Sequence, residues 1–224
     1  AIIGVVTMLG IRTLIPVMPA HNGTNLSREF AVFNRPQVWI SALLSVLSFG
    51  GVIGGFTYIA FTLTQVSGFT AQAVPWLLVL FGAGTFVGNI YGGKAADKSL
   101  NKSLGTILLL LTVVMSAFAV FAHSQIMTVI LLLMMGAVGL ATAPGLQLRM
   151  MKYASDAPTV ASGTNIAAFN IGNAVGAYLG GIALEKGYGF VSPLWVGAAL
   201  SLVALVVVIV GSLNAGLKTS QLQG

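Results

Sequence analysis

Long apolar runs with almost no charge dominate this chain, and they decide what it can fold into. The stretch from Thr106 to Met115, TILLLLTVVM, is one example. Only 6% of the 224 residues are charged and 57% are hydrophobic, whereas a soluble domain carries about 25% charged residues. The chain therefore lacks the polar side chains that a water-facing surface needs, which excludes a cytosolic enzyme and a disordered chain. It contains no cysteine, which also excludes a disulfide-stabilised secreted domain.

The lengths of the apolar segments predict an all-α membrane protein. A membrane-spanning helix needs about 20 mostly apolar residues, and seven segments meet this requirement. They lie at residues 1–19, 38–63, 74–95, 103–122, 126–148, 158–184 and 191–213. The strict apolar–polar alternation of a membrane β-barrel is not present. Because the sequence starts inside an apolar run without a Met, we expect it to be a piece of a longer protein.

Basic residues are distributed very unevenly between the two ends of these predicted spans. The loops and tail on one side contain eight of them: Arg28, Arg35, Lys94, Lys98, Lys102, Arg149, Lys152 and Lys218. The loops on the other side contain Lys186 alone. Because short loops rich in Lys and Arg usually stay in the cytoplasm, we predict a multi-pass protein of the plasma membrane (the bacterial inner membrane) with a cytoplasmic C-terminus. The same pattern explains the net charge of +6 without a nucleic-acid partner.

The predicted spans fall into two kinds. Spans 103–122 and 191–213 are almost purely apolar at their centres, as expected for helices that face lipid. The other four are rich in glycine and carry polar side chains: 38–63, 74–95, 126–148 and 158–184. Because a buried amide without a partner is costly, we expect these four to pack against protein or to line a wet cavity. From residue 38 onward the order inner, inner, outer occurs twice, and repeated three-helix units are typical of secondary transporters.

Two of the inner spans carry glycine at every fourth position. One set is Gly84, Gly88 and Gly92, and the other is Gly172, Gly176 and Gly180. This spacing places each set on one face of a helix, and small residues let helices approach closely in lipid. We therefore predict that both sets are helix-packing contacts.

Two motifs resemble the major facilitator superfamily. Residues 88–98, GNIYGGKAADK, are similar to its loop signature, roughly G-x-L-A-D-R, and residues 165–181, NIAAFNIGNAVGAYLGG, resemble the eleventh helix of its drug/proton antiporters of the arabinose-efflux permease type. The resemblance covers essentially the whole chain. It implies the last helix of an N-terminal half at 1–19, a central cytoplasmic loop at 20–37, a six-helix C-terminal half at 38–213 and a cytoplasmic tail at 214–224.

The loop signature also implies a gate at the cytoplasmic side. It assigns gating roles to Gly93, Lys94 and Asp97, because the acidic residue is thought in this family to hold the gate through a basic partner. Repeat symmetry makes Arg149 the natural partner of Asp97. The alternative is that both are ordinary loop charges, which contribute little as an exposed pair.

A strip of amide and aromatic side chains is the candidate substrate site. Asn165, Phe169 and Asn173 are spaced four residues apart and so share a helix face. Three residues on neighbouring spans would complete the wall of a cavity: Tyr58, Phe61 and Gln147. Ligand pockets are mostly apolar with a few polar groups, which suits small amphipathic or sugar-like compounds. The alternative is that the amides only form hydrogen bonds between helices.

The repeated three-helix pattern predicts a secondary transporter, and the resemblance implies efflux by alternating access that is driven by protons. Its partners would be the lipid bilayer, the N-terminal half, a small-molecule substrate and protons. No catalytic set, phosphate-binding loop or metal-ligand cluster occurs, so we expect no enzyme, cofactor or metal. The four acidic residues all lie in loops or at span ends: Glu29, Asp97, Asp156 and Glu185. A proton-carrying carboxylate would therefore belong to the N-terminal half.

Two other readings remain open. One is a membrane subunit that packs with partner helices and transports nothing. The other is a channel, which would need a continuous polar stripe or a ring of charges; neither is evident in the sequence.

Overall fold

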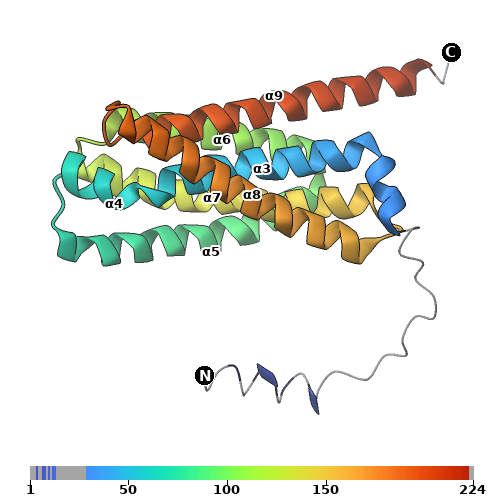
Figure 1. Ribbon diagram of the computed structural model, residues 1–224, viewed down its shortest axis with the longest axis horizontal. Helices are drawn as coiled ribbons and strands as arrows, with labels where there is room; N and C mark the ends of the chain where they lie inside the picture. The colour runs from blue at the N-terminus through green and yellow to red at the C-terminus, as the bar shows by residue number, and fades with distance from the viewer. Residues whose placement is uncertain (1–3, 5–6, 9, 11, 14–28, 222–224) are drawn as a thin grey trace.

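The structure is a computed structural model that describes residues 4, 7–8, 10, 12–13 and 29–221. Within this part of the chain it is a bundle of long helices running side by side (Figure 1). The predicted span at 1–19 and the first part of the loop at 20–37 lie largely outside the described residues.

Six long helices make up the bundle. They are α3 (Pro36–Thr57), α5 (Val74–Lys98), α6 (Leu100–Phe121), α7 (Gln125–Tyr153), α8 (Pro158–Glu185) and α9 (Ser192–Gln221). Each contains a segment long and apolar enough to cross a membrane. The described residues form no strand, so the prediction of an all-α membrane protein with six spans from residue 38 onward is confirmed.

Short elements connect the long helices. A 3-10 turn, η1 (Ala31–Asn34), precedes α3, and a short α4 (Ile59–Phe61), a π-helical turn η2 (Thr62–Val66) and η3 (Ala71–Ala73) join α3 to α5. Several helix ends follow simple sequence rules. Pro36, Pro75 and Pro158 lie in first helical turns, where the missing N–H would have no partner in any case. Gly187, with φ of 78°, follows the end of α8 in a conformation that glycine adopts readily.

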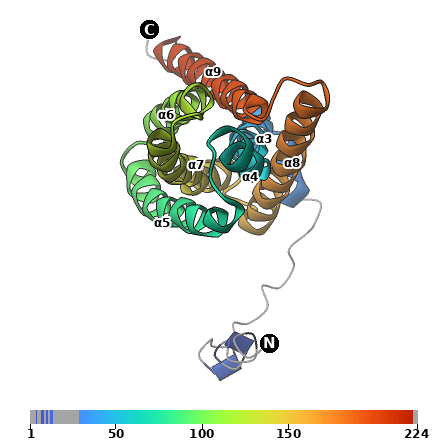
Figure 2. The same cartoon turned by 90° about the vertical axis from the view of Figure 1, so that its left-hand side faces the viewer.

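Helices α3 and α7 lie at the centre of the bundle, and the other four long helices surround them. Viewed along the bundle, α6 and α9 lie together on one side, while α5 and α8 lie on the other (Figure 2). The face of α6 that is turned inward buries Leu104, Leu108 and Leu111 completely. Its opposite face exposes Leu109 and Val113, as expected for a helix in contact with lipid.

The first glycine set is the contact between α5 and α7. A Cβ atom added at Gly84 would lie 2.9 Å from the backbone nitrogen of Ala137, and one added at Gly88 would collide with the carbonyl oxygen of the same residue. Gly92 meets the backbone of Ala141 in the same way. The two helix backbones are therefore in direct contact along two turns.

The second set makes an equivalent contact between α3 and α8. Gly172 and Gly176 lie against the backbone of Gly50, and a Cβ added at Gly54 would lie 2.8 Å from the carbonyl oxygen of Gly176. Gly180 lies against the ring of Tyr58. Glycines thus face each other across this contact. In the first contact α7 places Ala137 and Ala141 opposite the glycines of α5, and its own Gly136 lies against the backbone of Phe81.

We predict that Gly176→Ala destabilises the full-length protein by about 1–3 kcal/mol, because the added methyl group overpacks a backbone contact. The matched control is Gly163→Ala on the same helix, where an added Cβ meets nothing within 4 Å. That change should leave stability unchanged or raise it by up to about 1 kcal/mol. Thermal unfolding in detergent measures both, and equal unfolding temperatures for the two variants would show that the contact is not close.

Candidate functional site

A chain of hydrogen bonds connects three of the inner helices. Ser45 of α3 donates from Oγ to Oδ1 of Asn165 on α8 at 2.6 Å. Asn165 in turn donates from Nδ2 to Oε1 of Gln147 on α7 at 2.6 Å, and Gln147 donates from Nε2 to Oγ of Ser162 at 3.0 Å. Asn165 is completely buried, whereas Gln147 is partly exposed. In this conformation Asn165 therefore acts between helices, and Gln147 is the amide of the network that reaches an open side.

Phe169 and Asn173 follow Asn165 along α8. The ring of Phe169 stacks on Phe49 of α3, with ring centroids 3.8 Å apart. Asn173 lies one turn further along the same face and is partly exposed. Its Oδ1 atom is buried and has no hydrogen-bond partner among the described residues. A buried carbonyl oxygen without a donor is unfavourable by roughly 1–3 kcal/mol, so this amide is not optimised for stability.

Tyr58 and Phe61 lie further toward one end of the bundle. The Tyr58 hydroxyl donates to the carbonyl oxygen of Ala177 at 3.0 Å, so it is a contact between α3 and α8. Phe61 is half exposed and stacks on Phe190, in the connection between α8 and α9, at 5.9 Å between centroids. Tyr58 is nine residues beyond Phe49, or about 14 Å along a helix. The structure therefore joins Gln147 to Asn165 and places the Tyr58 hydroxyl beside Ala177, one turn of α8 beyond Asn173. Phe61 lies apart from these residues, against the connection between α8 and α9.

A cavity of about 400 Å³ lies between α5 and α7. Thr85 and Asn89 of α5 and Leu140 of α7 are among its lining residues. Leu140 also borders a small void next to Phe49 and shares a helix face with Gln147, seven residues later. We call this surface, formed by Asn89, Leu140, Phe49, Phe169 and Asn173, the central face.

Two residues of this region were not predicted from the sequence: Asn89 as a lining residue and Ser45 as a partner of Asn165. Asn89 was visible as an amide in the middle of an apolar span. Ser41, Ser45 and Ser48 are spaced as i, i+4 and i+7, and all three are completely buried. That spacing was the available signal for a buried polar face on α3.

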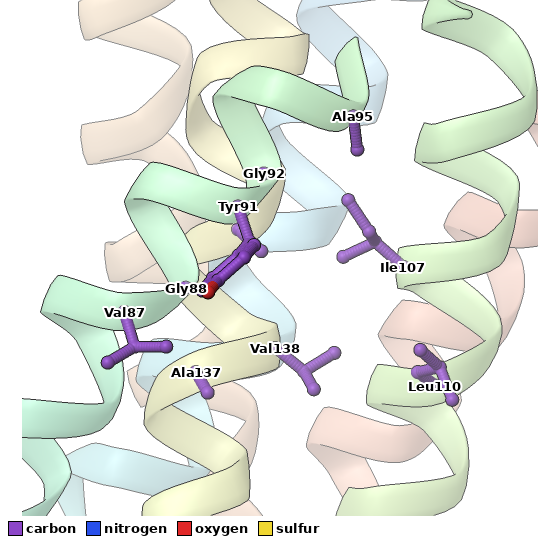
Figure 3. Close-up of a pocket in the computed structure, with 10 residues that line it drawn as sticks. Val87, Gly88, Tyr91, Gly92, Ala95, Ile107, Leu110, Ala137 and Val138 are labelled. Carbon is purple, nitrogen blue, oxygen red and sulfur yellow. The ribbon is translucent and has the colours of Figure 1, made fainter. Parts of the chain in front are cut away.

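A second cavity, of about 280 Å³, lies between α5, α6 and α7. Figure 3 shows Val87 and Tyr91 of α5 facing Ile107 and Leu110 of α6 across it. Gly88 and Gly92 contribute to its lining, but none of the predicted substrate-lining residues does. It is an apolar gap beside the glycine contact, on the side of α5 that faces α6.

The ends of the helices that carry most Lys and Arg form a second polar cluster, which we call the basic end. Arg35 makes a two-pronged ion pair with Asp156, both N–O distances being 2.8 Å, and also donates to the carbonyl oxygen of Tyr153 at 3.0 Å. This side chain therefore ties the start of α3 to the connection between α7 and α8.

Arg149 is buried at the basic end, with 4% of its surface exposed. It donates to Oδ1 of Asn101 at 2.7 Å and to Oε1 of Gln37 at 3.4 Å, and its guanidinium carbon lies 5.1 Å from the centre of the Tyr153 ring. The expected ion pair with Asp97 is absent among the described residues in this conformation, so the gating role of the pair stays a prediction. Asn101, in the first turn of α6, occupies the position beside the guanidinium, and Asp97 is exposed at the end of α5.

The other two gating candidates also lie near the end of α5. Lys94 is exposed, and its ammonium group lies 5.7 Å from the centre of the Tyr91 ring. A Cβ added at Gly93 would lie 3.9 Å from the Cβ of Pro144 on α7. Among the described residues, no group of His, Asp or Glu side chains has an arrangement that could hold a metal ion.

We predict that Asn165→Ala lowers the free energy of unfolding of the full-length protein by about 1 kcal/mol, because it removes two interhelical hydrogen bonds of roughly 0.6 kcal/mol each. Asn170→Ala is the control, since the Asn170 side chain is exposed and bonds only to the backbone of its own helix, at Ile166. Thermal unfolding of the purified protein measures the difference. If Asn170→Ala lowers the unfolding temperature as much as Asn165→Ala does, the hydrogen bonds of Asn165 do not stabilise the contact between helices.

Comparison with known proteins agrees with this architecture. The family model of the Major Facilitator Superfamily matches residues 1–167 and 72–218. The chain is 38% identical over 206 residues to the inner membrane transport protein YdhP of Escherichia coli (strain K12), which covers 92% of this chain and 53% of that protein.

Two further relatives carry functional names. The chain is 31% identical over 188 residues to the chloramphenicol resistance protein of Streptomyces lividans, covering 84% of this chain and 48% of the relative. It is 24% identical over 208 residues to the purine ribonucleoside efflux pump NepI of Salmonella enteritidis, covering 93% and 52%. The chain spans about half the length of these curated relatives. From the match of the family model and the six membrane-spanning helices, we conclude that this chain belongs to the Major Facilitator Superfamily, a family of membrane transporters and not of enzymes.

Proposed function

We propose that this chain forms the C-terminal half of a proton-coupled secondary transporter that exports a small uncharged molecule by alternating access. In this proposal residues 38–213 are the six-helix half, 1–19 is the last helix of the N-terminal half, 20–37 is the central cytoplasmic loop and 214–224 is the cytoplasmic tail. The coverage of about half of each relative supports this division. The concentration of Lys and Arg at the basic end supports a cytoplasmic C-terminus.

The unpartnered Oδ1 of Asn173 is the observation that carries the proposal. Buried polar groups in proteins are almost always hydrogen-bonded, and the exceptions are often functional. The terminal torsion of Asn is soft, so we infer that rotation of the amide would bring this oxygen to the partly exposed side of Asn173. There it would accept a hydrogen bond from a hydroxyl or N–H group of a substrate.

The neighbours of Asn173 favour an uncharged, partly aromatic substrate. Phe169 and Phe49 offer a stacked aromatic surface, and Gln147 and Asn89 offer amides that both donate and accept hydrogen bonds. None of these side chains carries a charge at any ordinary pH. The names of two relatives, which refer to chloramphenicol resistance and to purine ribonucleoside efflux, support small polar compounds and the outward direction.

In this site Asn165 would be a positioning residue. Its Nδ2 holds Oε1 of Gln147 at 2.6 Å, and Ser45 holds Asn165 in turn. Because these hydrogen bonds fix the orientation of the Gln147 amide, its NH₂ group has a defined direction before a substrate binds. This lowers the conformational entropy that is lost on binding.

In this proposal the N-terminal half contributes the partner of Asp97 at the gate and the carboxylate that carries the coupling proton. Asp97 is exposed and makes no ion pair with a described residue, so its carboxylate is available to a basic group or a helix N-terminus of the other half. Gly93, Lys94 and Arg149 would support that contact from α5 and α7. The proton-carrying carboxylate would also belong to the other half, since the acidic residues of this chain lie at loops and span ends.

A non-transporting subunit is the alternative function. It would need the same helix contacts but would have no use for the unpaired Asn173 oxygen. The two functions therefore predict different effects of Asn173→Leu, because leucine has the same branched shape and number of side-chain heavy atoms but no side-chain carbonyl.

We predict that Asn173→Leu lowers transport by about tenfold, the effect of one lost hydrogen bond, and leaves the unfolding temperature unchanged or slightly higher. Transport is measured with the full-length protein in proteoliposomes with an imposed pH gradient, using radiolabelled chloramphenicol and a purine ribonucleoside as probes. Asn170→Ala is the control and should transport as the unmodified protein does.

Two results would count against the proposal. If neither probe is transported under the pH gradient, proton-driven export of this substrate class is contradicted. Normal flux by Asn173→Leu would show that the transporter does not use this oxygen, and the site would have to lie elsewhere.

A further inference from the structure

We propose that the groove between α6 and α9 binds an anionic phospholipid at the basic end of the bundle. The groove has a volume of about 800 Å³, within the range of about 300–1,000 Å³ that is usual for ligand sites. It lies between α6 and α9, which lie together on one side of the bundle (Figure 2). It is therefore separate from the central face and from the proposed transport site.

One end of the groove is polar and cationic. Ser99, Asn101, Lys102 and Thr106 line it, so it offers an ammonium group, two hydroxyls and an amide within the first two turns of α6. Ammonium and hydroxyl donors suit phosphate oxygens. The N-terminus of α6 adds the partial positive charge of a helix of 22 residues to the same place.

The other end of the groove is apolar. Leu109 of α6 and Leu205, Val208 and Ile209 of α9 form its walls. From Ser99 to Leu109 the groove follows α6 for about 15 Å. A soluble anion would make no use of this wall, whereas the acyl chain of a phospholipid would cover it while the phosphate occupies the polar end.

Gly105 keeps the groove open. It lies in the middle of the lining, and a Cβ added there would have Val208 Cγ1, at 3.9 Å, as its nearest neighbour. Unlike the glycines of α5 and α8, it does not bring two backbones together. Its lack of a side chain leaves space between α6 and α9 instead.

Arg149 is the second observation that favours an anion here. Its buried guanidinium donates to Oδ1 of Asn101 at 2.7 Å, its Nε atom has no partner, and no described carboxylate pairs with it. A buried cation without an anion is strongly unfavourable. A phosphate in the groove would lie just beyond Asn101 and would offset part of this charge.

The orientation of Asn101 fits this arrangement. Its Oδ1 accepts from Arg149, so its NH₂ group remains as a donor and makes no hydrogen bond with another described residue. Asn101 is also a lining residue of the groove. It would therefore connect the buried guanidinium on one side to a phosphate oxygen on the other.

The test is native mass spectrometry of the purified, delipidated full-length transporter with added palmitoyl-oleoyl phosphatidylglycerol, and with phosphatidylcholine of the same acyl chains. We expect one phosphatidylglycerol to be retained in preference to phosphatidylcholine. Lys102→Gln should weaken its binding by roughly fivefold, the usual effect of one lysine at an anionic lipid surface. Lys98→Gln is the control, since it removes the same charge from the same end but lies outside the groove.

A second variant and a competitor test the acyl-chain part of the proposal. Gly105→Leu should fill the groove and reduce retention of both lipids, and its unfolding temperature shows whether it is folded. Inorganic phosphate at millimolar concentration should not displace the lipid. Equal losses in Lys102→Gln and Lys98→Gln, no preference over phosphatidylcholine, or displacement by phosphate would each overturn the assignment.

Discussion

Direct backbone contact between paired helices is the constraint on which the rest of this structure depends. In lipid the hydrophobic effect does not drive helices together, so association relies on close packing and polar contacts. Gly88 on Ala137 and Gly176 on Gly50 bring α5 to α7 and α3 to α8 with no side chain between them. These two pairs hold the amides and aromatics of the central face in place. The apolar α6 and α9 need no such contact on the faces they turn toward lipid.

Polar groups inside the bundle serve two different purposes. Asn165 has both ends of its amide satisfied by Ser45 and Gln147, which fixes three helices relative to one another. Asn173, two turns later on the same helix, keeps an unpartnered oxygen. A network that is fully hydrogen-bonded stabilises a unique arrangement, while an unpaired group lowers stability. On α8, Asn165 therefore belongs to the contacts between helices, whereas Asn173 belongs to the region that we assign to the substrate.

Residue spacing predicted the helices and their packing faces, because both depend on periodicities within one segment. The four-residue glycine repeats identified the faces of α5 and α8, but spacing carries no information on which helix lies opposite. For the same reason the sequence showed Asn165 as an amide at membrane depth without showing that Ser45 and Gln147 satisfy it.

Repeat symmetry predicted Arg149 as the partner of Asp97, but it does not resolve which polar side chain in the next turn lies closer to the guanidinium in this conformation. Asn101 is only four residues after Asp97, and it takes that place. Phe61 was grouped with Phe169 because both lie on inner spans, but nothing in the sequence showed how far apart along the bundle they are.

Cysteine cross-linking tests most directly whether the α5–α7 pair is one closely packed unit. The Cβ atoms at positions 93 and 144 would lie 3.9 Å apart, within the range of a disulfide, and this chain has no cysteine of its own. In a full-length background without other cysteines, Gly93→Cys with Pro144→Cys should form an intramolecular disulfide under mild oxidation, with or without a pH gradient. Gly82→Cys with Pro144→Cys, three turns away, should not. Failure of the first pair to cross-link, or cross-linking that depends on the gradient, would contradict a packed α5–α7 unit.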